Sequence, residues 1–264
     1  TGIYMYKGNV TLGKQSSITG DSDDVLITVR NNTNENTLTI NGGTAAAGSP
    51  TILEATGDNN IGINIQDGRT NKGTTLKIEN DTAASGWNVN FVGKNNVGVK
   101  NNYFAKDLTI KNTITNNNMP GGNFDYGVMR NSGDNGIMFA NLGYVHKGTL
   151  QLDAVNMTGR NSAIAAFINP NYSKEGNATA LNGTLGNSGI FNTNNGGSIK
   201  LQGVIGSANT NTDSSHSVGV YANTGQSSAH STAEFGYATS PTEDVTDLTI
   251  SGLNIGLGQF ANNS

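Results

Sequence analysis

The sequence has no cysteine, four prolines, few aromatic residues (6%) and few charged residues (13%) in 264 positions. Without cysteine there is no disulfide framework, no thiolate zinc site and no thiol nucleophile. The basic residues are scattered singly and the net charge is −4, which excludes an electrostatic surface suited to nucleic acid or an anionic membrane. No apolar run approaches the ~18 residues of a transmembrane helix. No secretion signal is recognisable, so we expect an exported protein of this kind to be a piece of a longer chain.

Glycine, asparagine, threonine and serine take the place of charge, and these are the residues of turns and polar ladders. The apolar residue types make up 34% of the chain, which with the 36 glycines is enough for a core and does not indicate disorder. Helical periodicity is poor, whereas segments such as Thr37–Ile40 alternate at period two. The sequence therefore predicts an all-β protein.

A two-part phrase recurs along the chain. A glycine beside apolar residues is followed, after a polar turn, by two aliphatic residues separated by one position. The five clearest cases are Gly2-Ile3-Tyr4 with Val10/Leu12, Ile61-Gly62-Ile63 with Leu76/Ile78, Val97-Gly98-Val99 with Leu108/Ile110, Gly136-Ile137-Met138 with Leu150/Leu152, and Gly189-Ile190 with Ile199/Leu201. Phrases of this kind are typical of stacked coils, whose strands must align while their corners vary in length.

Glycine or alanine markers for the coils fall at Gly62, Gly98, Gly136, Ala163, Gly189, Gly219 and Gly256. They predict one parallel β-helix over residues 1–264, with about eight or more coils. The alternative is an antiparallel sandwich or barrel, which also has short strands and many turns. In the β-helix, the aliphatic pairs, including Leu248/Ile250, stack into ladders, and corner asparagines pass amide hydrogen bonds from coil to coil.

The segments GIYMYKG, IGINI and VGVYANTG, with Leu-x-Ile strands and Asn-rich turns, make the chain resemble a bacterial autotransporter passenger of type V secretion. It is most similar to the long Asn/Gly-rich adhesins of the fusobacterial type. The resemblance covers the whole chain and rests on repeat texture. It implies a right-handed parallel β-helix outside the outer membrane, with a translocator β-barrel elsewhere in the parent chain. Such passengers act as adhesins, toxins or enzymes, so the family alone does not select a function.

Motifs for catalysis or metal binding are incomplete. Asn211-Thr212-Asp213 resembles the first motif of polygalacturonases, but the motifs that should follow it are missing. Gly20-Asp21-Ser22-Asp23 resembles a serine nucleophile motif, but has Asp23 where glycine is needed. The histidines at 146, 216 and 230 lack metal-ligand spacing. Asp21, Asp23 and Asp24 lack a known calcium-loop pattern, and a solvated corner is the favoured interpretation. We expect no enzyme activity, no cofactor and no metal.

Three segments interrupt the repeat, at about 112–126, 169–180 and 224–246. They carry aromatic residues in polar surroundings, a composition that favours recognition surfaces. The candidate contact residues are Phe124, Tyr126, Tyr172, His230, Phe235 and Tyr237. The alternative is that these side chains fold back and cover the flank of the solenoid.

Together these patterns predict an extracellular passenger segment, anchored to the bacterial surface through other parts of the parent. It would act as an adhesin or structural rod that binds a protein or glycan receptor on a host or bacterial cell. One alternative is a polysaccharide-active β-helix enzyme, which needs carboxylates converging on one wall. The other is a toxin subunit that oligomerises through its solenoid.

Overall fold

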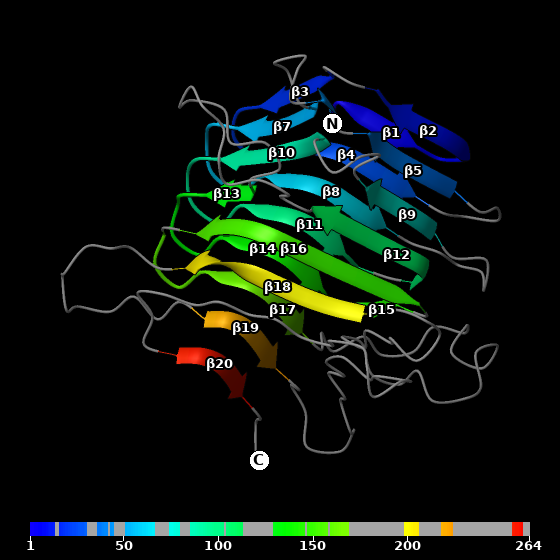
Figure 1. Cartoon of the computed structure of the whole chain (residues 1–264). Coiled ribbons are helices and arrows are strands. Elements are labelled where there is room, and N and C mark those ends of the chain that lie inside the picture. Colours follow the sequence, from blue (N-terminus) through cyan, green and yellow to red (C-terminus); the bar gives the residue numbers. More distant parts are fainter. Residues whose placement is uncertain are drawn as a thin grey trace.

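Short strands joined by Gly- and Asn-rich turns stack along one axis in the computed structural model (Figure 1). The structure describes residues 1–13, 16–30, 36–41, 43–44, 51–66, 74–79, 85–102, 104–112, 129–145, 147–157, 159–168, 198–205, 218–223 and 255–260. Within these ranges every regular element is a β-strand. The first and last strands, β1 and β20, lie at opposite ends of the stack.

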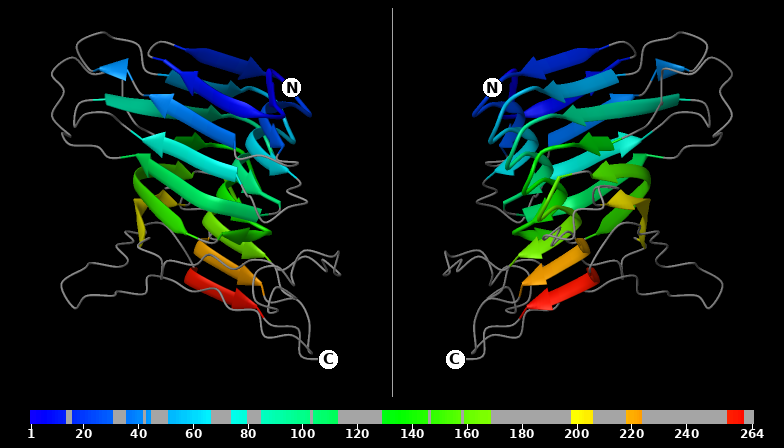
Figure 2. Two further views of the ribbon diagram at one scale, coloured as in Figure 1. Left: turned by 90° about the vertical axis from the view of Figure 1, so that its right-hand side faces the viewer. Right: turned by 90° about the vertical axis from the view of Figure 1, so that its left-hand side faces the viewer.

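An eight-stranded parallel sheet forms what we call the first wall. Its strands follow one another in chain order: β1 (Ile3–Met5), β4 (Val25–Arg30), β8 (Ile61–Gln66), β11 (Val97–Asn101), β14 (Ile137–Asn141), β17 (Ala163–Ile168), β19 (Val218–Asn223) and β20 (Ile255–Phe260). Each strand pairs in register with the equivalent strand of the next coil. Figure 2 shows the strands of successive coils stacked side by side.

A twelve-stranded sheet supplies the other two walls, because two of its strands run through both. The second wall holds β2 (Gly8–Leu12), β5 (Asn36–Asn41), β9 (Thr74–Glu79), β12 (Phe104–Asn112), β15 (Tyr144–Val145) and the first parts of β16 (Gly148–Met157) and β18 (Ser198–Ile205). The third holds β3 (Ser17–Gly20), β7 (Thr51–Ala55), β10 (Ser85–Phe91), β13 (Met129–Asn131) and the last parts of β16 and β18. Register shifts between Leu152 and Val155 mark the bend in β16.

A coil is thus one strand from each wall, in chain order. The ladders are parallel, apart from two antiparallel pairs between the short strand β6 (Gly43–Thr44) and β10. This arrangement is consistent with a parallel β-solenoid and excludes the antiparallel sandwich or barrel, whose neighbouring strands would run in opposite directions. The expected all-β repeat is therefore confirmed at the level of parallel, in-register stacking.

Aliphatic ladders run through the core, as the two-part phrase predicts. In the first wall, Ile27, Ile63, Val99, Phe139 and Ala165 lie one above another and are almost fully buried. In the second wall, an unbroken ladder joins six coils: Leu12, Ile40, Ile78, Ile110, Leu150 and Ile199. Stacking identical positions puts each apolar side chain against similar ones in both neighbouring coils, so burial is nearly complete away from the ends.

The expected register is wrong at one of these levels. We expected Leu150 and Leu152 to stack on Leu108 and Ile110, but Leu150 pairs with Ile110, and Leu108 pairs with Gly148. The cause is that β15 continues the second wall ahead of β16, with Tyr144 paired to Phe104. Asn95 and Asn135 at the preceding corner are 40 residues apart in sequence, and so are Ile110 and Leu150. The same spacing between equivalent positions therefore persists through the whole coil.

Two of the predicted coil markers are also wrong. Met138, not Gly136, lies level with Gly98, because Val97 pairs with Ile137 and Val99 with Phe139. Ile164, not Ala163, lies level with Met138 and Gly219, because Ala163 pairs with Ile137 and Val218, and Ala165 pairs with Phe139 and Val220. The marker at Gly189 lies outside the described residues. The markers at Gly62, Gly98, Gly219 and Gly256 are correctly placed. Ile61 and Ile63 on either side of Gly62 pair with Val97 and Val99 on either side of Gly98, and the residues flanking Gly219 and Gly256 pair in the same way. Leu248 and Ile250 lie outside the described residues.

Side-chain sizes in the core compensate between different walls: within a coil, a large residue on one wall is matched by a small residue on another. A Cβ atom on Gly62 would lie 2.9 Å from Cζ of Phe91 and 2.5 Å from the Gly98 carbonyl oxygen, so the ring of Phe91 occupies that space. One coil earlier the sizes are reversed, with Leu26 in the first wall and Ala55 in the third. A large side chain on one wall thus requires a small residue on the other, as close packing demands.

Phe91 is fully buried while its neighbour Val92 is 46% exposed, which makes the two a matched pair for testing the core. We expect Phe91→Ala to lower the free energy of unfolding by about 3–5 kcal/mol, because it leaves a cavity between the walls. Val92→Ala should change it by less than about 0.5 kcal/mol. Urea denaturation followed by circular dichroism measures both; equal effects would contradict the assigned core.

Candidate functional site

The predicted contact residues Phe124, Tyr126, Tyr172, His230, Phe235 and Tyr237 lie outside the described residues, as do nearly all of the three interrupting segments. The described part of the chain instead contains three polar arrangements with defined geometry. One is the corner between the third and first walls. The others are on the outer surfaces of the second and first walls.

The corner between the third and first walls repeats a four-residue turn, which we call the Asn corner. Its five copies are residues 21–24, 57–60, 93–96, 133–136 and 159–162, with the sequences DSDD, GDNN, GKNN, GDNG and GRNS. The third residue of every copy has a left-handed backbone, with φ between 52° and 61°: Asp23, Asn59, Asn95, Asn135 and Asn161. Asparagine and aspartate tolerate this conformation better than other residues with a side chain.

These left-handed residues form an amide ladder along the outside of the corner. Each asparagine donates from Nδ2 to the side-chain oxygen of the preceding coil. The distances are 3.0 Å for Asn59 to Asp23, 2.9 Å for Asn95 to Asn59, 2.9 Å for Asn135 to Asn95 and 3.3 Å for Asn161 to Asn135. Because an amide both donates and accepts, it can pass the bond on. Aspartate can only accept, and Asp23 therefore stands at the end of the ladder.

The fourth residue of the corner forms a second ladder, inside the first. Asn60 and Asn96 are fully buried. Asn96 Oδ1 accepts from the Asn60 backbone N–H at 2.7 Å, and its Nδ2 donates to the carbonyls of Gly57 and Val92 at 3.0 and 3.1 Å. A buried polar group without partners would cost several kcal/mol. The buried amides therefore satisfy backbone groups that the turn leaves out of the sheets.

The first residue of the corner must be small because successive coils approach closely there. A Cβ atom on Gly93 would collide with the Gly57 carbonyl, one on Gly133 with the Gly93 carbonyl, and one on Gly159 with the Gly133 carbonyl. Gly93 also has φ of 108°, which side chains other than hydrogen disfavour. Glycine here sets the spacing of the coils.

The second residue of the corner alternates in charge from coil to coil, in the order Ser22, Asp58, Lys94, Asp134, Arg160. Each carboxylate also accepts the backbone N–H of the next cation, at 2.7 Å for Lys94 to Asp58 and 2.9 Å for Arg160 to Asp134. If a coil were skipped during folding, Asp58 would face Asp134, or Lys94 would face Arg160. The alternation therefore opposes stacking of coils that are not consecutive.

Our sequence interpretation missed this repeat, although the signal is present. The pattern Gly, any residue, Asn, then Asn, Gly or Ser before an apolar residue occurs at Gly57, Gly93, Gly133 and Gly159. These glycines mark the coils correctly where Gly136 did not. Asp21, Asp23 and Asp24, which we considered as calcium ligands, belong to the first copy; Asp24 Oδ2 accepts the Asp21 backbone N–H at 3.1 Å.

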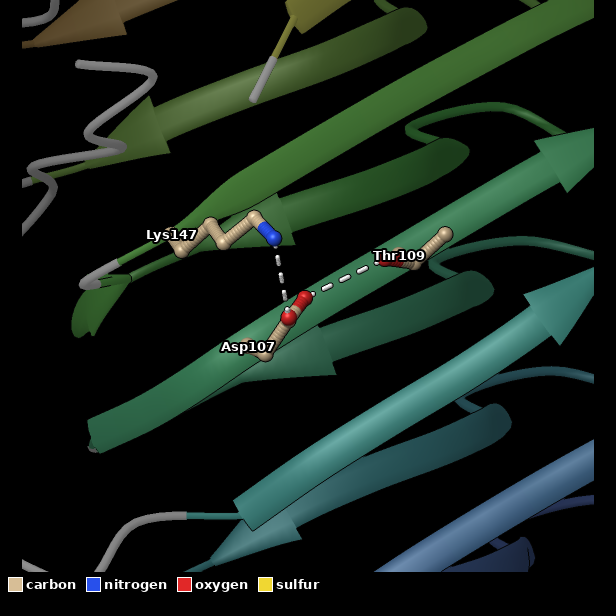
Figure 3. Close-up of polar contacts among 3 residues, drawn as sticks. All are labelled: Asp107, Thr109 and Lys147. Atoms are coloured by element: carbon tan, nitrogen blue, oxygen red, sulfur yellow. Dashed lines mark hydrogen bonds and ion pairs between the residues drawn. The ribbon is translucent and has the colours of Figure 1, made fainter. Parts of the chain in front are cut away.

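On the outer surface of the second wall, Asp107 is held between two neighbours (Figure 3). Its Oδ2 lies 3.6 Å from Lys147 Nζ on the next coil, and its Oδ1 accepts from Thr109 Oγ1 at 3.1 Å. Glycoside hydrolysis needs two carboxylates on either side of a sugar bond. This group brings one carboxylate and one cation together, which ties two coils to each other. In the described part of the chain, no three His, Asp or Glu side chains gather as a metal site.

On the outer surface of the first wall, two tyrosines project from the first coil. Tyr4 and Tyr6 are 53% and 51% exposed, whereas Met5 between them is buried. Arg30, in the next coil, donates from Nη1 to the Tyr4 hydroxyl at 3.4 Å. Together with Val92, these tyrosines are the large apolar side chains found exposed among the described residues.

The chain matches no protein family model, no curated protein and no solved structure. Among the described residues, no helix is long and apolar enough to cross a membrane. Function therefore has to be argued from the geometry of the solenoid and its surfaces.

Replacing a single ladder nitrogen by oxygen tests the Asn corner. Asn96→Asp should lower the free energy of unfolding at pH 7 by about 3 kcal/mol or more, because a buried carboxylate then faces two carbonyls. At the exposed position 95, Asn95→Asp should lower the free energy of unfolding by about 1 kcal/mol or less.

Burial raises the folded-state pKa of the new carboxyl at position 96 above its unfolded value of about 3.9. The Asn96→Asp deficit should therefore shrink as the pH falls from 7 towards 5, because the folded state binds the proton more tightly. Urea denaturation at both pH values measures this; a deficit independent of pH would contradict the inner ladder.

The alternating charges are tested by Lys94→Asp, with Lys94→Gln as the neutral control. The aspartate variant places three carboxylates on consecutive coils, so its thermal midpoint should fall below that of the glutamine variant. About 1 M salt should remove most of this difference, since exposed charges are screened there. Thermal scans at low and high salt measure the effect, and equal midpoints for the two variants at low salt would show that alternation has no role.

Proposed function

We propose that the chain is a segment of an autotransporter passenger: a right-handed parallel β-helix of eight coils that is displayed at a bacterial cell surface as an adhesive or structural rod. The observation that carries this proposal is the continuity of the ladders. In-register core stacks and the Asn corner link successive coils in a chain that has no cysteine and few charged residues.

A rod is the natural use of such a structure. Each coil adds about 4.8 Å, so eight coils span about 40 Å, and every coil depends mainly on its two neighbours. Reach and stiffness then grow with coil number rather than with a larger core. The right-handed sense follows from the general preference of parallel strands for right-handed crossover connections.

Loops at the corners are the expected carriers of adhesion. The ladders resume in register after each interruption. Asn112 pairs with Leu152 before the first one, and Met129 pairs with Val89 after it. Asn223 pairs with Phe260 on the next coil across another. Insertions at corners therefore leave the stacking intact, which frees their sequences for recognition of a protein or glycan receptor.

Cell binding tests the proposal. The purified chain and a variant with Thr224–Thr246 replaced by a short Asn-Gly turn are incubated with host cells and with bacteria. Adhesion through this loop predicts that the parent binds and the variant does not, while both keep the same strand signal in circular dichroism.

A second variant, with residues 113–126 replaced by the same turn, serves as the matched control for a shortened corner. Binding by neither parent nor variants would assign the segment to a spacer role. Light scattering on the same samples separates adhesion from the toxin-subunit alternative, which requires assembly that increases with concentration.

A further inference from the structure

We infer that the outside of the Asn corner is the contact surface of a homodimer, in which two copies of the chain lie antiparallel with corner against corner. The surface consists of the second and third residues of four corner copies, at positions 58–59, 94–95, 134–135 and 160–161, and we call it the corner edge. The inference goes beyond the proposed adhesive function, because it names a partner for a part of the solenoid that is separate from the interrupting segments.

The corner edge is open to solvent and its charges are available to a partner. The side chains of Asp58, Lys94 and Arg160 are exposed, and that of Asp134 is half-buried. The two carboxylates bond backbone N–H groups of the next coil through Oδ1. In the described part of the chain, neither Lys94 Nζ nor the Arg160 guanidinium makes a hydrogen bond or an ion pair. Opposite charges on consecutive coils therefore project outward instead of pairing with each other.

The order of the charges makes the corner edge complementary to its own reversed image. Along the stack the sign is negative at Asp58, positive at Lys94, negative at Asp134 and positive at Arg160. A two-fold axis that passes between the coils of Lys94 and Asp134 reverses this order in the second copy. Lys94 then faces Asp134 of the second copy, and Asp58 faces Arg160 of the second copy. A two-fold interface uses the same patch on both copies and requires this self-complementarity.

Other alignments of the same two surfaces are less favourable. Because both copies have the same coil spacing of about 4.8 Å, all four contacts of the antiparallel pair form together. Parallel copies in register would place like charges opposite each other at every position. Parallel copies displaced by one coil would pair three opposite charges and leave Arg160 of one copy and Asp58 of the other without a partner. Like charges across an interface suppress a wrong alignment, so the antiparallel dimer is selected.

The amide ladder is compatible with the same arrangement. In the antiparallel pair, Asn95 lies level with Asn135 of the second copy, and Asn59 with Asn161. Each of these exposed asparagines donates one N–H along the stack. An amide nitrogen has two N–H donors, so a second one is left for the other copy. The neutral groups between the charges can therefore bond across the interface, which avoids unpaired polar groups there.

The size of the corner edge predicts a transient dimer. Asp58 and Arg160 are three coil steps apart, which is about 15 Å. A standard protein interface buries about 800 Å² on each side around an apolar centre. Beside the corner edge the structure describes one exposed large apolar side chain, Val92. We therefore expect a dissociation constant of about 0.1 mM at low salt, where exposed charges are screened least.

Sedimentation equilibrium of the purified chain at concentrations up to about 1 mM tests the inference. At low salt the chain should form dimers and no larger species, and about 1 M salt should return it to the monomer. Lys94→Asp creates two like-charge contacts in each dimer and should weaken dimerisation about tenfold. The neutral control Lys94→Gln should have a smaller effect. Both substitutions leave the hydrogen bonds of the Lys94 backbone in place.

A charge exchange separates this interface from the role of the charges inside one copy. When Lys94→Asp is combined with Asp134→Lys, opposite charges again face each other at all four contacts of the antiparallel dimer. Dimerisation should therefore return to within about threefold of the parent. Within one copy the same exchange places like charges on consecutive coils, so a role confined to coil stacking predicts no recovery. Circular dichroism checks the fold of the double variant, which loses the acceptor of the Arg160 backbone N–H.

Three results would overturn the inference: a chain that stays monomeric up to about 1 mM at low salt, dimerisation that Lys94→Asp does not weaken, or growth beyond two copies. The last would favour the toxin-subunit alternative. If the double variant does not fold, the comparison of Lys94→Asp with Lys94→Gln still decides the question. The adhesive proposal is judged separately, because loss of cell binding with Thr224–Thr246 does not depend on whether the chain dimerises through the corner edge.

Discussion

Hydrogen bonding between coils at the Asn corner is the constraint on which the rest of the structure depends. In the first four copies the left-handed residue donates its backbone N–H to the carbonyl of the corner residue one coil on, as in Asn59 to Lys94 at 2.8 Å and Asn95 to Asp134 at 2.8 Å. The side-chain amide of each asparagine bonds the same position one coil back. The corner therefore fixes the spacing and register with which every following strand must begin. The three walls inherit that register until an insertion or a bulge changes it.

This constraint accounts for the unusual composition. A corner repeated at every coil needs a residue that tolerates φ near 60° and can both donate and accept, which asparagine does and charged residues do not. Close approach of the coils needs glycine two residues before that asparagine. Inside, each coil buries its aliphatic residues against two neighbours, so disulfides are unnecessary once several coils are stacked. Low charge, many glycines and many asparagines are thus consequences of one geometry.

The same geometry separates two kinds of surface that could recognise a partner. Corner insertions can vary without disturbing the ladders, because pairing resumes on the far side of each one. Side chains on the walls are spaced by the paired strands, as the bond between Arg30 and Tyr4 on adjacent coils illustrates. The paired Asp107 and Lys147 on the second wall illustrate a third use of an outer surface, which is to hold neighbouring coils together.

The sequence by itself determined the all-β class, the repeated two-part phrase and most strand positions, because the period-two apolar pattern and the polar turns are local signals. Asparagine stacking at the corners was also predictable from composition. Only the tertiary structure decided the register, since it depends on residues 26 to 40 positions apart along the Asn ladder. Local pattern placed Gly136 as a marker and put Leu152 level with Ile110, and the paired strands showed both to be wrong. It also could not show that Gly62 makes room for Phe91, because complementary volumes meet across walls that are distant in sequence.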